Sequence, residues 1–181
     1  MGAKDQGADA TAGRWLALPR TLCFVTHGSD LLLMKRALHK RVYPGRYNGV
    51  GGHIERDEDP LTGAVREIQE ETGLDVTDVR LRGVIHVDAG EPTGILVFVF
   101  TAEAASRELI ECDEGTLEWV PLDAVDDLPL VEDLPLLLPA IFDHPDAPPF
   151  FAHTSYDAND NMIMVFAGPQ PDWADADDPA D

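Results

Sequence analysis

The clearest hydrophobic pattern in the chain lies between Asp59 and Gly73. Apolar residues there recur three and four positions apart, which predicts an amphipathic helix with one inward-facing stripe. The stripe consists of Leu61, Ala64, Val65, Ile68 and Thr72. Asp59 suits the N-cap of this helix, Pro60 its first turn, and Gly73 the left-handed residue at its end.

Shorter apolar runs separated by turn residues predict strands. They cover residues 21–26, 31–36, 47–54, 79–87, 95–101, 117–121, 150–156 and 162–166. Hairpin signals join the first two runs and the last two. A second apolar segment, residues 134–142, predicts another helix despite Pro135 and Pro139. Strands interleaved with helices in this order indicate an α/β protein with a mixed sheet covered by helices.

The composition predicts one folded domain between two polar ends. The chain has 181 residues, enough for one sizeable core. Residues 1–13 are small and polar, and residues 168–181 are acidic and proline-rich, so both segments are expected to be disordered. The domain is then expected to span residues 14–167. With no long apolar run, no secretory signal pattern and only two cysteines, we expect a cytoplasmic protein that neither enters a membrane nor depends on disulfides.

The charge distribution restricts the partners. A formal net charge of −21 argues against binding to nucleic acid, because phosphate neutralisation needs Lys and Arg. No Lys or Arg follows Arg107, and a basic cluster precedes the glycines at 49–52. The cluster suits a small polyphosphate, although a solvated strand and loop with incidental charges is the alternative. It consists of Lys35, Arg36, Lys40, Arg41 and Arg46. We therefore expect a small-molecule nucleotide partner and either a monomer or a homodimer.

The predicted helix carries the candidate chemistry. Glu67, Glu70 and Glu71 lie three and four residues apart, so their carboxylates converge on one edge of the helix. Such like charges are unfavourable unless a cation lies between them, and Mg2+ or Mn2+ prefers oxygen ligands. Three glutamates alone could also form a solvated acidic face, with Arg66 and Glu70 as an ordinary i,i+4 ion pair.

The spacing around these glutamates resembles the Nudix box, G-x5-E-x7-R-E-U-x-E-E-x-G-U with U aliphatic. Every specified position is filled, by Gly52, Glu58, Arg66, Glu67, Ile68, Glu70, Glu71, Gly73 and Leu74. The resemblance implies the Nudix α/β/α sandwich and hydrolysis of a phosphoanhydride. It implies catalytic roles for Glu67, Glu70, Glu71 and Arg66, with Arg66 orienting a glutamate.

The same resemblance implies a metal site. Glu67, Glu70 and Glu71 are the expected ligands, with the Gly52 carbonyl beside them. Some members of the family add a distant acid from a loop before a late strand, and Glu114 occupies that place. Glu114 could instead be one more exposed acid in an acidic loop.

Residues 45–52 resemble the MutT type, especially enzymes that remove oxidised purine nucleoside triphosphates. Asn48 is the expected base contact, although a turn asparagine is common beside glycine. Glu132 and Asp133 resemble that group's acidic pair, which would accept hydrogen bonds from guanine; they could instead cap the second helix. Val131 stands where an aromatic residue is frequent, and His53 where lysine is frequent. His53 could meet a phosphate or pack within the sheet, and Arg46 belongs to the expected polyphosphate contact.

These features favour a Mg2+-dependent pyrophosphohydrolase that converts a purine nucleoside triphosphate, such as 8-oxo-dGTP, to its monophosphate and pyrophosphate. One alternative is hydrolysis of a nucleoside diphosphate derivative such as ADP-ribose. Another is a noncatalytic ligand sensor, against which the complete set of box glutamates argues. An acidic surface protein adapted to high salt would not explain Gly52, Arg66 and Gly73 in register.

Overall fold

The computed structural model describes residues 6–7 and 11–167. Its elements in chain order are β1 (Leu16–His27), β2 (Asp30–Arg36), β3 (Tyr47–Asn48), α1 (Pro60–Thr72), β4 (Val76–Val87), β5 (Thr93–Ala104), β6 (Gly115–Pro121), the 3-10 helix η2 (Leu122–Asp127), α2 (Leu134–Phe142), β7 (Phe150–Tyr156) and β8 (Met162–Ala167). The segments predicted to be disordered, 1–13 and 168–181, fall largely outside the described residues. Their disorder and the 14–167 domain bounds stay predictions.

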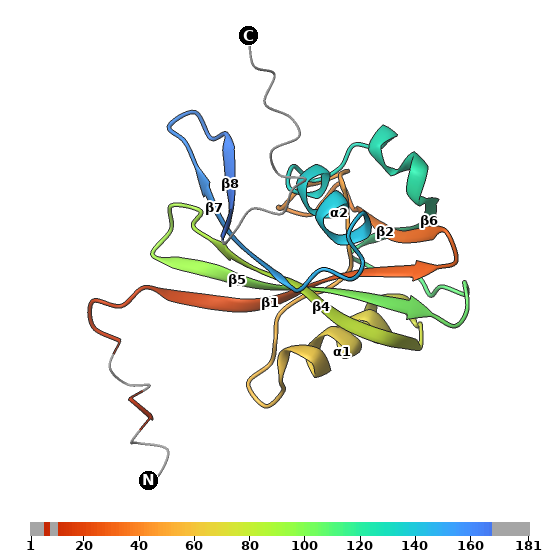
Figure 1. Cartoon of the computed structure of the whole chain (residues 1–181), viewed down its shortest axis with the longest axis horizontal. Helices are drawn as coiled ribbons and strands as arrows, with labels where there is room; N and C mark the ends of the chain where they lie inside the picture. Colours follow the sequence, from red (N-terminus) through yellow and green to blue (C-terminus); the bar gives the residue numbers. More distant parts are fainter. Residues whose placement is uncertain (1–5, 8–10, 168–181) are drawn as a thin grey trace.

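In the described part of the chain, eight strands form one mixed sheet. The strand order is β3-β2-β1-β5-β4-β7-β8, and β6 pairs with β2. β1 runs parallel to β5, and β4 runs parallel to β7, while the other pairs are antiparallel. Figure 1 shows α1 on one face of the sheet and α2 on the other. The predicted α/β/α sandwich with a mixed sheet is confirmed.

The alternation of side chains along β1 divides the interior into two cores. Leu22 and Phe24 belong to the cluster that α2 covers, whereas Cys23 and Val25 belong to the cluster that α1 covers. Successive residues of a strand point to opposite faces of the sheet, so a run of consecutive apolar residues is needed where both faces are covered.

The helix α1 begins and ends where its capping residues predict. The Asp59 carboxylate accepts hydrogen bonds from Leu61 N at 2.8 Å and Thr62 N at 3.1 Å. Gly73 ends the helix with φ 75° and donates its N–H to the Gln69 carbonyl.

The inward face of α1 is narrower than predicted. Ala64, Ile68 and Thr72 are fully buried, but Leu61 and Val65 remain 47% and 40% exposed. The inward orientation predicted for Leu61 and Val65 is therefore wrong. The helix packs on the sheet through the row formed by Ala64, Ile68 and Thr72, which are spaced four residues apart.

The second helix, α2, is short, apolar and held at its C-terminal end by Arg82 of β4. Arg82 is only 7% exposed and donates to three carbonyl oxygens, those of Ile141, His144 and Pro145. The bond to Ile141 satisfies a carbonyl that the end of the helix leaves unpaired, and the bonds to His144 and Pro145 hold the segment that follows α2. None of the helices in the described ranges is long and apolar enough to cross a bilayer.

The glycine-rich segment 47–54 is a regular strand only at its start. β3 ends at Asn48, after which isolated bridges pair Val50 with Cys23 and His53 with Arg20. This segment lies unusually close to β1, since a Cβ on Gly51 would be 2.5 Å from the Thr21 carbonyl oxygen. The prediction of one continuous strand over 47–54 is therefore wrong, because the glycines permit an approach too close for a regular ladder.

Candidate functional site

Segment 48–53 positions the candidate site by crossing β1 beside the side chains of α1. The Gly52 carbonyl accepts from Thr21 N at 2.8 Å, which turns this oxygen toward β1. A Cβ on Gly52 would lie 2.6 Å from the Glu67 carboxylate oxygens. The missing side chain of Gly52 thus lets Glu67 approach the backbone. The ligand role predicted for its carbonyl stays a prediction.

Arg66 organises the carboxylates of the candidate site. Its guanidinium binds Glu58 through two bonds of 2.7 and 3.0 Å and the His53 carbonyl at 2.9 Å. It also donates at 2.9 Å to one oxygen each of Glu67 and Glu70. These five bonds use every N–H of the guanidinium, and its hydrogen bonding to the Glu58 carboxylate is the largest cause of its raised pKa. Arg66 is therefore a positioning residue and has no donor left for a substrate.

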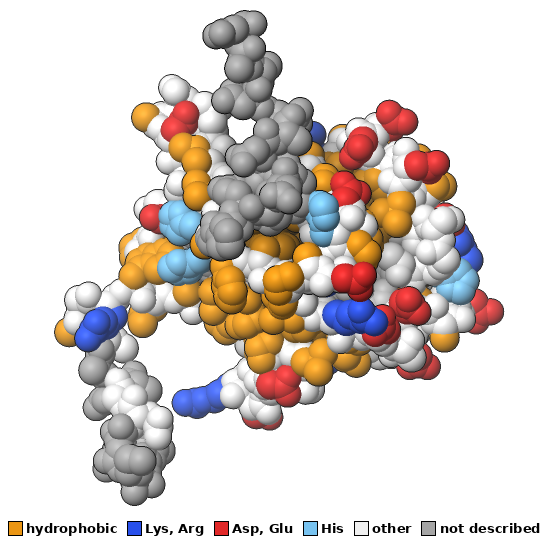
Figure 2. Space-filling view, viewed as in Figure 1, with side chains coloured by type: hydrophobic (Ala, Val, Ile, Leu, Met, Phe, Trp, Pro, Cys, Tyr) orange, Lys and Arg blue, Asp and Glu red, His pale blue; other side chains and the backbone are white. Residues whose placement is uncertain are grey.

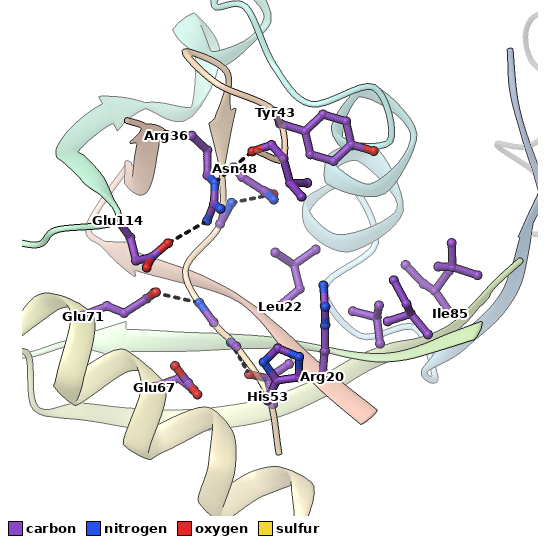
Figure 3. Close-up of a pocket in the computed structure, with 18 of the residues that line it drawn as sticks. Arg20, Leu22, Arg36, Tyr43, Asn48, His53, Glu67, Glu71, Ile85 and Glu114 are labelled. Carbon is purple, nitrogen blue, oxygen red and sulfur yellow. Dashed lines mark hydrogen bonds and ion pairs between the residues drawn. The ribbon is translucent and has the colours of Figure 1, made fainter. Parts of the chain in front are cut away.

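Glu71 is half-buried, as is Glu67, whereas Glu70 is exposed. One of its carboxylate oxygens accepts from Gly51 N at 2.9 Å, which fixes the side chain against segment 48–53. Burial, followed by the negative charges of Glu67 and Glu114, raises the pKa of Glu71 to about 7, although the hydrogen bond from Gly51 N acts in the opposite direction. The structure therefore brings Glu71, Glu67 and Glu114 to one electronegative region, as Figure 3 shows.

Glu114 faces this region from the loop before β6, but two cations already hold it. Lys40 Nζ lies 2.6 Å from one carboxylate oxygen, and an Arg36 guanidinium nitrogen lies 3.4 Å from the other. Lys40 and Arg36 of the predicted basic cluster thus neutralise an acid of the protein.

The donor set of these glutamates suits a hard divalent cation, because it consists of carboxylate oxygens. Arg66 takes one oxygen of Glu67 and one of Glu70, which leaves the second oxygen of each for a cation. Among the described residues, no three acidic, His or Cys side chains lie close enough to form a ready-made metal site. A cation would therefore have to draw the carboxylates together.

One cavity of about 810 Å³ joins these glutamates to a second group of polar residues. Asn48 lines it, and its side-chain oxygen accepts from Gly49 N at 2.9 Å, so its amide N–H2 remains to donate. Asp133 lines it too, with Oδ1 buried and unpaired, and burial raises its pKa to about 6. Asp133 stands at the N-cap of α2 but makes no side-chain capping bond, which removes the capping alternative for this residue.

The structure separates Glu132 from its neighbour Asp133. Glu132 is exposed, lies outside the cavity lining and accepts hydrogen bonds from the Tyr43 hydroxyl at 3.3 Å and the Tyr156 hydroxyl at 3.2 Å. Both tyrosines line the cavity. The Glu132 carboxylate thus holds two tyrosines that line the cavity. The base contact predicted for Glu132 stays a prediction.

Arg46 and His53 also differ in their placement. Arg46 is not among the residues that line the cavity, and its exposed guanidinium donates to the Leu130 carbonyl at 3.5 Å. Arg46 thus joins its loop to the segment before α2, and its predicted polyphosphate contact stays a prediction. His53 is exposed and lines the cavity, so the alternative of a histidine packed inside the sheet does not hold.

The cavity lining includes residues that were not predicted from the sequence, among them the polar residues Arg20, Tyr43, Thr154 and Tyr156. Arg20 alone carried a usable signal, because it stands two residues before Leu22 and four before Phe24, on the face of β1 that is otherwise apolar. The tyrosines and Thr154 reach the cavity from segments far apart in the sequence.

The comparisons with known proteins agree with this geometry. Residues 17–141 match the NUDIX domain family. The oxidized purine nucleoside triphosphate hydrolase of Mus musculus is 34% identical over 107 residues, which cover 58% of this chain and 67% of that protein. The NAD-capped RNA hydrolase NudC of Pseudomonas aeruginosa is 31% identical over 113 residues, which cover 61% of this chain but only 38% of that protein.

Solved structures resemble the fold over most of the chain. The MutT protein of Bacillus halodurans aligns with a TM-score of 0.71 at 24% identity, covering 85% of this chain and 99% of that one. The NUDIX domain of Shewanella oneidensis NrtR, solved with ADP ribose, aligns with a TM-score of 0.64 at 18% identity, covering 80% and 99%. Taken with the domain match and the mouse relative, this shows that the chain belongs to the Nudix family, as a MutT-type hydrolase.

Proposed function

We propose that this protein is a Mg2+-dependent nucleoside triphosphate pyrophosphohydrolase that acts on oxidised purine nucleotides such as 8-oxo-dGTP. The products would be the nucleoside monophosphate and pyrophosphate. The observation that carries the proposal is the single cavity that connects the glutamates of α1 with Asn48 and Asp133. Such a cavity has room for a charged phosphate chain at one end and a polar ring at the other.

The mouse relative supports the choice of substrate, because it is named an oxidized purine nucleoside triphosphate hydrolase. Glu67, Glu70 and Glu71 are the residues that would hold the cation. When bound, Mg2+ supplies charge neutralisation for the phosphate oxygens and activation of water. The same carboxylate oxygens would also bind Mn2+.

The protein's own residues supply position and charge. Arg66 keeps Glu58, Glu67 and Glu70 in place, and Gly52 admits Glu67 to the cavity. At the other end, the Asn48 amide donates to a base acceptor, while Asp133 accepts from a base N–H. Rigid placement of this kind lowers the activation barrier by holding the reacting groups in position before the reaction begins.

Two free cysteines are consistent with a reducing compartment, and we place the enzyme in the cytoplasm. Cys23 is buried and Cys112 partly buried, and neither forms a disulfide within the described residues. Burial raises the pKa of the Cys23 thiol to about 12, so it is unreactive at neutral pH.

The test is Mg2+-dependent turnover of 8-oxo-dGTP, dGTP and ADP-ribose by the wild type and by Glu71→Gln, scored for pyrophosphate and phosphate. The amide keeps the shape of Glu71 but removes its charge, so we expect turnover to fall at least ~100-fold. Glu91→Gln is the matched control, because Glu91 is an exposed loop acid outside the cavity lining.

Three outcomes would contradict the proposal. Near-wild-type activity of Glu71→Gln at saturating Mg2+ would remove the carboxylate assignment. Turnover of ADP-ribose in preference to every triphosphate would replace the substrate class. A wild-type protein that binds nucleotides without hydrolysing them would identify a ligand sensor.

A further inference from the structure

The cavity contains three buried polar atoms that have no protein partner. In the described part of the chain, the buried side-chain atoms without a hydrogen bond are Arg20 Nε, Asp133 Oδ1 and Thr154 Oγ1. All three residues line the same cavity. Buried polar groups are normally paired, so three unpaired ones on residues around one cavity are groups that water or a ligand in the cavity would complete.

Arg20 differs from the other two arginines that line the cavity. Arg66 is saturated by glutamates and a carbonyl, and Arg36 is paired with Glu114. Within residues 6–7 and 11–167, the Arg20 guanidinium takes part in no ion pair and no hydrogen bond. The N–H groups of the Arg20 guanidinium are therefore free to donate to a ligand in the cavity.

The pleat of β1 directs Arg20 away from the carboxylate end. The next residue, Thr21, points to the face where its hydroxyl accepts from Gly52 N at 3.3 Å, beside Glu67. Successive side chains alternate, so Arg20 shares the opposite face with Leu22. Figure 3 shows Arg20 extending from β1 into the space between Leu22 and Ile85.

The sheet provides a flat apolar floor beside Arg20. The backbone register places Arg20 opposite Val97, and Val97 opposite Ile85. The next row places Ile95 opposite Val87, and Val87 opposite Thr154. Arg20 on β1 and Thr154 on β7 therefore stand at two sides of a floor about three strand spacings wide, ~14 Å. The floor consists of Val97, Ile85, Ile95 and Val87, all of which line the cavity.

A planar ring on this floor would meet two kinds of partner at its edges. Arg20 has donors and no acceptor, whereas an ionised Asp133 has acceptors only. A 6-oxopurine such as guanine presents an acceptor oxygen at position 6 and a donor at the adjacent N1. Adenine presents an amino donor at position 6, which a guanidinium cannot accept.

We propose that Arg20 is a specificity-determining residue that donates to the 6-oxo group of the purine and selects 6-oxopurine nucleotides over 6-aminopurine nucleotides. The inference rests on the proposed function for its substrate class. It adds a residue of β1 to the base-reading set and gives that residue a definite atom to read.

The test is equilibrium binding of dGMP and dAMP by calorimetry, without metal, to the wild type and to Arg20→Gln, Arg20→Lys and Arg80→Gln. The wild type should bind dGMP more tightly than dAMP. Arg20→Gln should lower the dGMP affinity about tenfold and leave the dAMP affinity unchanged. Arg20→Lys keeps the charge but loses the planar fork, so the preference for dGMP should stay reduced. Arg80→Gln removes an exposed arginine of β4, and binding should match the wild type.

An equal loss for both nucleotides would overturn the inference, because it would identify a phosphate contact. Unchanged affinities, or a wild type that binds no dGMP, would overturn it as well. Melting temperatures verify folding, and if Arg20→Gln does not fold, Arg20→Lys decides by the same ratio. Failure of the proposed function would show separately, as absence of triphosphate turnover in a wild type whose dGMP binding still depends on Arg20.

Discussion

At the scale of single residues, the site contains two kinds of polar side chain. Some make all their hydrogen bonds to the protein, and others keep polar atoms that have no protein partner. Arg66 and Glu132 bind only protein partners, and this makes them supports of the site. Arg20 and Asp133 keep buried atoms without a partner. Asn48 belongs to both groups, since its oxygen serves the Gly49 backbone and its amide nitrogen is open.

This division predicts different effects for two substitutions of Asn48. Asn48→Asp keeps an oxygen that can accept from Gly49 N but removes the donating N–H2, so substrate discrimination should be lost while the melting temperature changes little. Asn48→Ala removes both and should lower the melting temperature as well. In each variant, kcat/KM for the preferred purine triphosphate should fall by ~1–3 kcal/mol. The measurement is relative kcat/KM for 8-oxo-dGTP, dGTP and dCTP. An unaltered ranking of the three substrates would show that Asn48 is a structural turn residue and does not contact the base.

At the scale of elements, the two helices are attached to the sheet in different ways. α1 has capping bonds at both ends and presents a row of buried side chains to the sheet. α2 has no side-chain cap at its start and contains Pro139, which cannot donate a backbone hydrogen bond. Its position depends on buried leucines and on Arg82, and Asp133 at its start depends on that position.

We therefore expect Arg82→Met to lower the free energy of unfolding by about 2–3 kcal/mol, because it removes the buried donor that joins the Ile141 carbonyl of α2 to the carbonyls of His144 and Pro145. Arg80→Met is the control on the same strand, since Arg80 is exposed and pairs only with Asp78 at 2.8 Å. The control should leave stability nearly unchanged, because exposed ion pairs contribute little. Urea denaturation of the two variants measures the difference. Equal losses would show that Arg82 does not anchor α2.

At the scale of the whole molecule, the net charge of −21 sets the solution behaviour. Figure 2 shows red acidic side chains scattered over the visible face, with blue basic ones standing singly. Mutual repulsion of so many carboxylates destabilises the compact state, and dissolved ions screen it over ~10 Å at 0.1 M.

The melting temperature at pH 7 should therefore rise between low salt and about 1 M KCl. The control is the same pair of measurements near pH 4.3, the isoelectric point, where the repulsion is largely absent and the rise should shrink. A melting temperature at pH 7 that stays constant or falls would count against a surface adapted to salt.

The features that the sequence alone determined are local ones. The sequence is enough to place the caps at Asp59 and Gly73, because capping depends on residues close in the chain. It is also enough to place the box from Gly52 to Leu74 and the second helix. The α/β class follows from the order of these elements.

The tertiary structure decided which side chains share the cavity. Arg20, Ile85 and Val97 become neighbours only through the pairing of β1 with β5 and of β5 with β4. Glu132 meets Tyr43 and Tyr156, which come from distant segments. Both results depend on which strands pair and in what register. That choice is made by the packing of the whole sheet between its two helices, and no local spacing in the sequence encodes it.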